Sequence, residues 1–188
     1  MVLRLRPSCR VAGLLLAVSG ILLAAVFPRF SAEELTARSQ VIVQGTVVRS
    51  WTAWDPEHKY IWTHYQVNLS DVIRGASAAT FTVSEPGGSL DGANQQVSGA
   101  ISYTPGETDF LFLYQTPIGY WRTSGGPQGK FVVDSAGRVR GGATTAVYAQ
   151  SAGRAAAGTA LPTLDGLSVL DFKNRLRQLA AANPFQER

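Results

Sequence analysis

The pattern of apolar and polar positions over residues 40–74 predicts two long β-strands joined by a tight turn. The apolar residues of the first strand occupy both faces, with Val41, Val43 and Val47 on one and Ile42 and Val48 on the other. A strand of this kind is central to a sheet or curls into a barrel. Gly45 in its middle permits a bend or a bulge.

The second strand of this hairpin alternates strictly for ten residues, from 60 to 69. This period of two is typical of a strand with one buried face. One face carries Ile61, Thr63, Tyr65, Val67 and Leu69, and the other carries Tyr60, Trp62, His64, Gln66 and Asn68. Residues 55–59 form the turn, where Pro56 presets a turn conformation.

Shorter elements follow the same logic along the rest of the chain. Ser31 caps a short helix that precedes the hairpin. Short strands are predicted at residues 80–84, 109–114, 120–123, 130–133 and 137–140. The connection at 86–108 is long for a compact domain, so it is expected to be functional or partly strand-forming, with strand-like pieces at Val97 and 101–103.

Three further segments flank the β-rich region at 31–141. Residues 142–163 are rich in alanine, glycine and threonine, which predicts a flexible linker. Residues 164–183 predict an amphipathic C-terminal helix, capped by Ser168 and with its apolar stripe at Val169, Phe172, Leu176 and Leu179. Residues 1–30 combine a basic start with an uncharged run at 11–27, which is the layout of a secretory signal or of a retained membrane anchor. Either way, the remainder is expected outside the cytoplasm, in the periplasm or beyond, and the membrane is involved only through this leader.

Charge and cysteine content narrow the function classes. The chain of 188 residues has a net charge of +4. Residues 31–188 hold 13 basic and 13 acidic residues, so the excess comes from the leader. The folded part therefore lacks the positive footprint of a nucleic-acid binder. Cys9, the single cysteine, lies in the leader, so the rest has no disulfide, no thiolate nucleophile and no cysteine-based zinc site.

These elements together predict a mainly β protein. Several short strands, one long twisted hairpin and no alternating helices favour a small closed β-barrel of the oligonucleotide/oligosaccharide-binding (OB) type over residues 31–141. An immunoglobulin-like sandwich is the alternative.

The order of short motifs over residues 33–133 resembles an uncharacterised family of exported bacterial β-domains. It is also similar, more distantly, to the OB-type barrels of netrin-like modules and of tissue inhibitors of metalloproteinases. The residues that carry the resemblance are Val41, Ile42, Gly45, Val47, Arg74, Gly75, Pro105, Gly106, Glu107, Leu111 and Leu113. The resemblance implies a barrel, and it suggests a protease as one partner. The animal inhibitors chelate the protease zinc through an N-terminal cysteine, which this chain lacks, so their mechanism transfers to no residue here.

Catalytic and metal-binding chemistry find little support in the sequence. His58 in the turn and His64 on the outward face of the second strand are expected to be separate surface histidines rather than metal ligands. No nucleophile elbow, phosphate loop or paired-acid motif occurs. We therefore expect a non-enzymatic protein without a cofactor or a metal.

The aromatic residues of the hairpin are the best candidate contact surface. Exposed rings on a rigid hairpin suit a glycan or a peptide, because they give contact area at low entropy cost. The alternative is that they pair across strands or pack under the C-terminal helix. The candidate ligand contacts are Trp51, Trp54, Tyr60, Trp62 and His64, with Tyr65 beside them. The resulting hypotheses are a binding module for an extracytoplasmic protein or polymer, a protease-associated accessory or inhibitor-like domain, and, third, a hydrolase.

Overall fold

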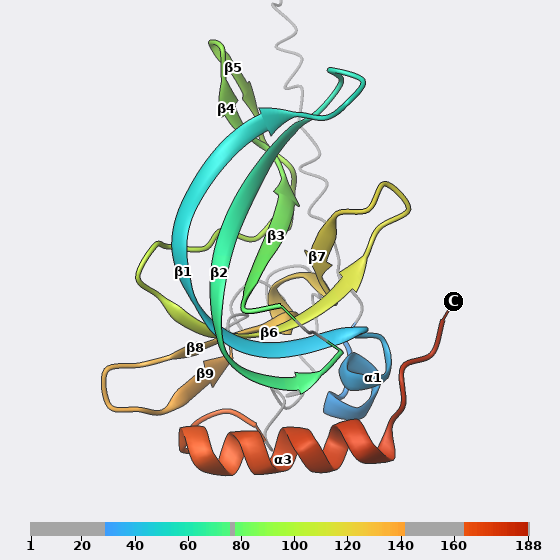
Figure 1. Cartoon of the computed structure of the whole chain (residues 1–188), viewed down its shortest axis with the longest axis vertical. Helices are drawn as coiled ribbons and strands as arrows, with labels where there is room; N and C mark the ends of the chain where they lie inside the picture. The colour runs from blue at the N-terminus through green and yellow to red at the C-terminus, as the bar shows by residue number, and fades with distance from the viewer. Residues whose placement is uncertain (1–28, 76–77, 142–163, 188) are drawn as a thin grey trace, which may run out of the picture.

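A computed structural model describes residues 29–75, 78–141 and 164–187 (Figure 1). The predicted linker at 142–163 and all but the last two residues of the predicted leader lie outside this part of the chain. The elements are α1 (Ala32–Ala37), β1 (Val41–Trp54), β2 (Ile61–Arg74), β3 (Thr80–Pro86), β4 (Gly88–Leu90), β5 (Ala93–Gln95), β6 (Thr108–Gln115), β7 (Trp121–Thr123), the 3-10 turn η1 (Gly126–Gly129), β8 (Lys130–Val133), β9 (Val139–Gly141) and α3 (Val169–Ala182). The prediction of a mainly β protein is confirmed.

Five of these strands pair in a ring. β1 pairs with β2, β2 with β3, β7 with β6, and β6 returns to β1, all antiparallel. The ring is completed by one parallel pairing between β3 and β7, at Val83 and Trp121. β8 and β9 continue the sheet outward from β6. The ring therefore has two surfaces, and each of its central strands contributes to both.

A separate apolar core lies on each surface of β1 and β6. The core enclosed by the ring contains Val41, Val43, Val47, Tyr65, Val67, Val83, Tyr103, Leu111 and Leu113. The second core packs the outside of the sheet against the two helices and contains Ala32, Leu35, Ile42, Phe110, Phe112, Phe131, Val139, Leu164, Phe172, Leu176 and Leu179. This double burial explains why β1 and β6 read as apolar on both faces.

β1 reaches both of its neighbours because it bends. Its register against β2 is interrupted in three places, including the step from Gln44 to Gly45. Such bulges bend a strand and increase its twist. Val48 sits at another interruption, between Val47 and Arg49, and is exposed. The alternation pattern placed Val48 with Ile42, and the bulge explains why only Ile42 is buried.

Gly45 is required at this bend by close packing. A Cβ atom added there would lie 2.5 Å from Val67 Cγ1 and 2.7 Å from the Asn68 carbonyl oxygen. Gly45→Ala is therefore expected to cost about 2 kcal/mol of unfolding free energy, measured by urea denaturation. Gly141→Ala is the control, because its Cβ would meet only Phe131 at 3.7 Å, an ordinary contact. Equal stability of the two variants would contradict this account.

The helices lie together at one end of the ring (Figure 1). Ser31 and Glu34 form a reciprocal capping box at the start of α1, and Ser168 accepts a hydrogen bond from the Asp171 N–H at the start of α3. Phe172, Leu176 and Leu179 are the buried residues of α3. Within residues 29–75, 78–141 and 164–187, no helix has the length and apolarity to span a bilayer.

The connection between β3 and β6 differs from the prediction. Its strand pieces are β4 and β5, which pair with each other as a small hairpin near the β1–β2 turn. Val97 and residues 101–103 form no strand. Tyr103 is instead buried in the ring core, and Val97 is exposed. The expected strands at these positions were therefore wrong. Tyr103, with Ile101 beside it, packs into the ring core without pairing as a strand.

Candidate functional site

The five candidate ligand contacts do not lie on one face. Trp51 pairs with His64 across β1 and β2, and Trp62 pairs with Ala53 two positions along. Because side chains alternate along a strand, Trp51, Trp62 and His64 share the outer face of the sheet. Trp54 points the opposite way. Tyr60 belongs to the turn between β1 and β2 and is 56% exposed.

Trp51 is the most exposed ring on the outer face. It is 37% exposed and stacks on His64, with ring centroids 5.3 Å apart and planes 27° apart. The Arg49 guanidinium lies 4.6 Å from the centre of the same indole. A cation near an indole face is attracted by the ring quadrupole. The Trp51 ring is therefore held in place before any ligand arrives.

His64 is buried, which corrects the expectation of a surface histidine. Only 8% of it is exposed, and its Nδ1 lies 2.8 Å from the Ser84 hydroxyl. Burial lowers the pKa of His64 below its usual value, which favours the neutral ring. Ser84 itself is buried, and its hydroxyl is engaged by this contact with His64. The contact orients the imidazole under Trp51.

Trp62 is also buried, which corrects the expectation of an exposed ring. It is 8% exposed because Tyr120 covers it edge-on, with centroids 4.9 Å apart. Tyr120 also meets His64 edge-on at 5.4 Å. The Arg122 guanidinium lies 5.8 Å from the centre of the Trp62 ring. The outer face thus carries a packed group, Trp51, Trp62, His64 and Tyr120, which we call the aromatic face.

The remaining hairpin aromatics have other roles. The Trp54 indole donates a hydrogen bond of 3.2 Å to Asp91 and stacks on His58, which ties the β1–β2 turn to the β4–β5 hairpin. Tyr65 lies inside the ring against Tyr103, with centroids 4.9 Å apart. The expectation that Tyr65 joins the contact surface was wrong, because it points to the inner face.

Tyr120 and Arg122 are the residues that the sequence did not single out. They flank Trp121 in β7, and that segment carried only the signal of a short strand. Their contacts to Trp62 and His64 depend on the parallel pairing of β3 with β7, which joins segments far apart in sequence. No local pattern could indicate this pairing.

A buried carboxylate holds β7 in position behind the aromatic face. Glu85 Oε1 accepts hydrogen bonds from the Thr123 N–H at 3.0 Å and from the Thr123 hydroxyl at 2.8 Å. Its Oε2 accepts from Arg122 Nη2 at 3.2 Å. Burial raises the pKa of Glu85, and these donors oppose that rise. Since β3 and β7 share only one backbone pairing, Glu85 is the main polar tie between these two strands.

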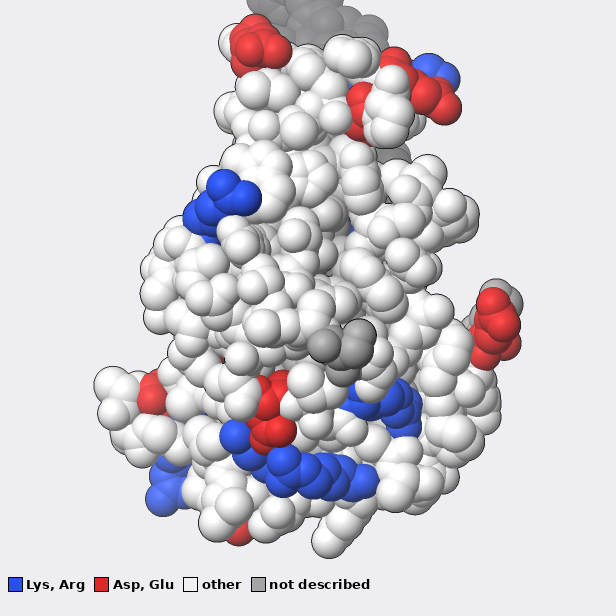
Figure 2. Space-filling view, in the orientation of Figure 1, with Lys and Arg blue, Asp and Glu red and all other residues white. Residues whose placement is uncertain are grey.

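The surface around this site is poor in charge. Figure 2 shows a largely uncharged area over the middle of the β1–β2 hairpin, with one basic patch at its edge, while charged side chains gather near the turn and along α3. Among the residues that the structure describes, no three His, Cys, Asp or Glu side chains gather closely enough to hold a metal ion. The arrangement suits recognition through rings and a few hydrogen bonds.

Comparison of the chain with family models, with curated proteins and with solved structures gives no match. The candidate function therefore rests on the residues and their geometry.

Proposed function

We propose that this protein is an exported, non-enzymatic binding module built on an OB-like barrel. The ring of five strands supports this architecture. In space β6 lies beside β1, which is followed by β2 and β3, so a fourth strand returns to lie beside the first. This is the order of a Greek key, and a five-stranded Greek-key barrel is the OB architecture. Export is proposed from the leader pattern at residues 1–30 alone.

The proposed ligand face is the outer side of β2 with the adjoining part of β1, where Trp51, Trp62 and His64 lie. OB barrels bind oligonucleotides and oligosaccharides on their second and third strands, beside the loops that join strands 1 to 2 and 4 to 5. Here these loops are the β1–β2 turn, with exposed Tyr60, and the β6–β7 turn, with exposed Ile118 and with Tyr120 at its end. The aromatic face lies between the two turns.

The observation that carries the proposal is the assembly of Trp51, Trp62, His64 and Tyr120 into one preformed ring cluster. Preformed aromatic surfaces bind with little loss of side-chain entropy. The balanced charge of residues 31–188 favours a neutral polymer over nucleic acid. We therefore propose a glycan chain or an extended peptide outside the cytoplasm as the ligand. The resemblance to inhibitor barrels supports the architecture only.

Trp51→Ala is expected to weaken ligand binding at least tenfold, because Trp51 offers the most exposed ring area of the aromatic face. The full chain is titrated with neutral oligosaccharides and with uncharged unstructured peptides, and the fluorescence of its tryptophans reports binding. One of the two probe classes should give a saturable signal.

Trp54→Ala provides the matched control for this titration. It removes an equally large ring from the same strand, but on the opposite face. Its affinity should equal that of the unaltered chain. Unchanged affinity in Trp51→Ala, or the absence of saturable binding for both probe classes, would overturn the proposal.

A further inference from the structure

A cavity of about 680 Å³ lies between α1, the β6–β7 end of the sheet and the C-terminal tail. Its volume falls within the range of small-molecule sites. Aromatic side chains line part of it, namely Phe30, Tyr114 and Phe185. Arg38, Arg122 and Ser124 supply polar groups to the same cavity.

Two of these polar groups have no partner. Ser124 is 2% exposed, and its hydroxyl makes no hydrogen bond within the described residues. The Arg38 Nε is likewise shielded from solvent and without an acceptor there. A buried polar atom without a partner costs about 1–3 kcal/mol, so two in one cavity call for an explanation.

The Arg38 guanidinium is the cation of this cavity that forms no ion pair within the described residues. The Arg38 guanidinium lies 4.2 Å from the centre of the Phe30 ring, and no carboxylate of the described residues is within ion-pair distance of it. Arg122, in contrast, is already paired with Glu85 at 3.2 Å. Glu187 from the tail also lines the cavity, but it forms no ion pair with Arg38. The unpaired charge therefore favours an anion.

We propose that this cavity binds a carboxylate attached to an apolar, flat body. The carboxylate would accept hydrogen bonds from Arg38 and from the Ser124 hydroxyl, because a guanidinium presents donors in a fork that matches a carboxylate. The apolar body would lie against Phe30, Tyr114 and Phe185. Two sources share this chemistry, a free organic acid and the C-terminal carboxylate of a peptide. The proposal stands independently of the ligand of the aromatic face, which adjoins the cavity through Arg122.

Calorimetric titration of the full chain with matched acids and amides tests the proposal. Benzoate is compared with benzamide, and a blocked dipeptide ending in phenylalanine with its C-terminal amide. We expect one-to-one binding of at least one acid, with the matching amide at least tenfold weaker. Tighter binding of benzoate assigns the site to a free acid, and tighter binding of the dipeptide assigns it to a chain end. Equal binding of acid and amide, or no saturable binding by either acid, overturns the proposal.

Variants locate the binding in this cavity. Arg38→Gln should weaken acid binding at least tenfold, and Ser124→Ala should weaken it a few-fold. Arg38→Lys keeps the charge but loses the fork, so an intermediate affinity is expected, and it replaces Arg38→Gln if that variant fails to fold. Arg49→Gln, which removes an arginine from the aromatic face, and Trp51→Ala should both leave acid binding unchanged. Full affinity in Arg38→Gln or in both Arg38→Lys and Ser124→Ala would overturn the assignment.

Discussion

Arg74→Ala is expected to lower the free energy of unfolding by about 3–5 kcal/mol, which is a large share of the stability of a domain of this size. The guanidinium of Arg74, at the end of β2, donates to four backbone carbonyls. Nη1 donates to Thr36 at 2.7 Å and to Ser39 at 3.3 Å. Nη2 donates to Ala180 at 2.5 Å and to Asn183 at 2.6 Å. Urea denaturation followed by circular dichroism measures the loss.

The size of this effect follows from where those carbonyls lie. Thr36 lies in the last turn of α1, and Ser39 directly follows its C-cap. Ala180 lies in the last turn of α3, and Asn183 is its C-cap. The last carbonyls of a helix have no partner within the helix, and the macrodipole makes that end negative. Neither helix carries a basic residue in its own last turn. Arg74 therefore supplies the charge and side-chain donors for both ends. Its removal takes a donor from each of the four carbonyls, of which that of Thr36 keeps the Ser39 N–H at 3.2 Å.

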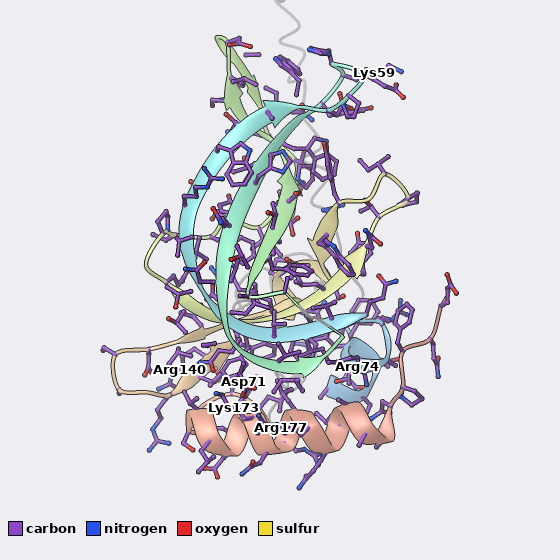
Figure 3. All side chains as sticks on the ribbon, viewed as in Figure 1. Lys59, Asp71, Arg74, Arg140, Lys173 and Arg177 are labelled. Atoms are coloured by element: carbon purple, nitrogen blue, oxygen red, sulfur yellow. The ribbon has the colours of Figure 1, made fainter. Side chains whose placement is uncertain are left out.

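Two comparison variants separate this role from general loss of charge. Arg177→Ala removes an arginine whose side chain is half exposed and whose partner, Asp71, keeps Lys173 at 3.0 Å (Figure 3). A surface pair of this kind contributes about 0–1 kcal/mol. Arg74→Lys should recover only part of the loss, because one ammonium cannot reach both helix ends as a fork does. A loss below about 1 kcal/mol in Arg74→Ala would contradict the bridging role.

Gly75, the next residue, has an equally structural role. Its φ is +80°, which favours glycine, and an added Cβ would lie 2.3 Å from the Gln40 carbonyl oxygen. The sequence presents Arg74 and Gly75 as a short motif at a strand end. The role of this motif depends on the ends of α1 and α3, which meet Arg74 at residues 36 and 180. The motif could therefore be noticed in the sequence, but its role could not be inferred.

Local patterns predicted the strands and caps of the fold well. β1 and β6 are apolar on both faces because each face packs into one of the two cores. The apolar residues of each face can be recognised within a few positions of the sequence. The Ser31 and Ser168 caps are equally local. Tertiary context decided the rest. The strands of this connection are β4 and β5 rather than the predicted pieces at Val97 and 101–103, and Tyr103 is buried in the ring core.

The candidate site was predicted only in part for the same reason. Alternation placed Trp62 and His64 together correctly, and the register adds Trp51. Exposure could not be inferred, since the ring that covers Trp62 and His64 comes from Tyr120, more than fifty residues further along the chain. Of the five proposed contacts, Trp51 alone presents an exposed ring on the aromatic face. Trp62 and His64 lie buried beside it.

Asp109 is expected to have the second large effect on stability, because its carboxyl group is buried and makes no hydrogen bond within the described residues. It is 0% exposed, and neither carboxylate oxygen has a hydrogen-bond partner within the described residues. Its nearest cation is Lys130, whose Nζ lies 3.8 Å from Oδ2 and is closer to Glu107, at 2.7 Å. Burial raises the pKa of Asp109 from 3.8 to about 7, with Lys130 lowering it and Glu107 raising it.

The sign of the resulting pH dependence is opposite to that of a salt-bridged carboxylate. Above pH 4 the Asp109 carboxyl loses its proton in the unfolded chain, while in the folded chain it keeps the proton until about pH 7. The folded state then holds more protons, so its stability falls as pH rises through this window and is level above it. Asp109→Asn cannot ionise. We therefore expect the unfolding free energy of Asp109→Asn, relative to that of the unaltered chain, to rise by about 2–4 kcal/mol as the pH rises from 4 to 8.

The measurement is the difference in unfolding free energy between Asp109→Asn and the unaltered chain, followed by urea denaturation from pH 4 to pH 8. Taking the difference removes the contributions of other titrating groups, among them Glu85 and His64. Asp134→Asn is the control of opposite sign. The Arg138 N–H holds the pKa of Asp134 below 3.8, so its carboxylate stabilises the fold once ionised, and Asp134→Asn should be the less stable chain at neutral pH. A difference for Asp109→Asn that stays flat across the window would mean that Lys130 keeps Asp109 ionised throughout, and that the ring interior holds a true ion pair.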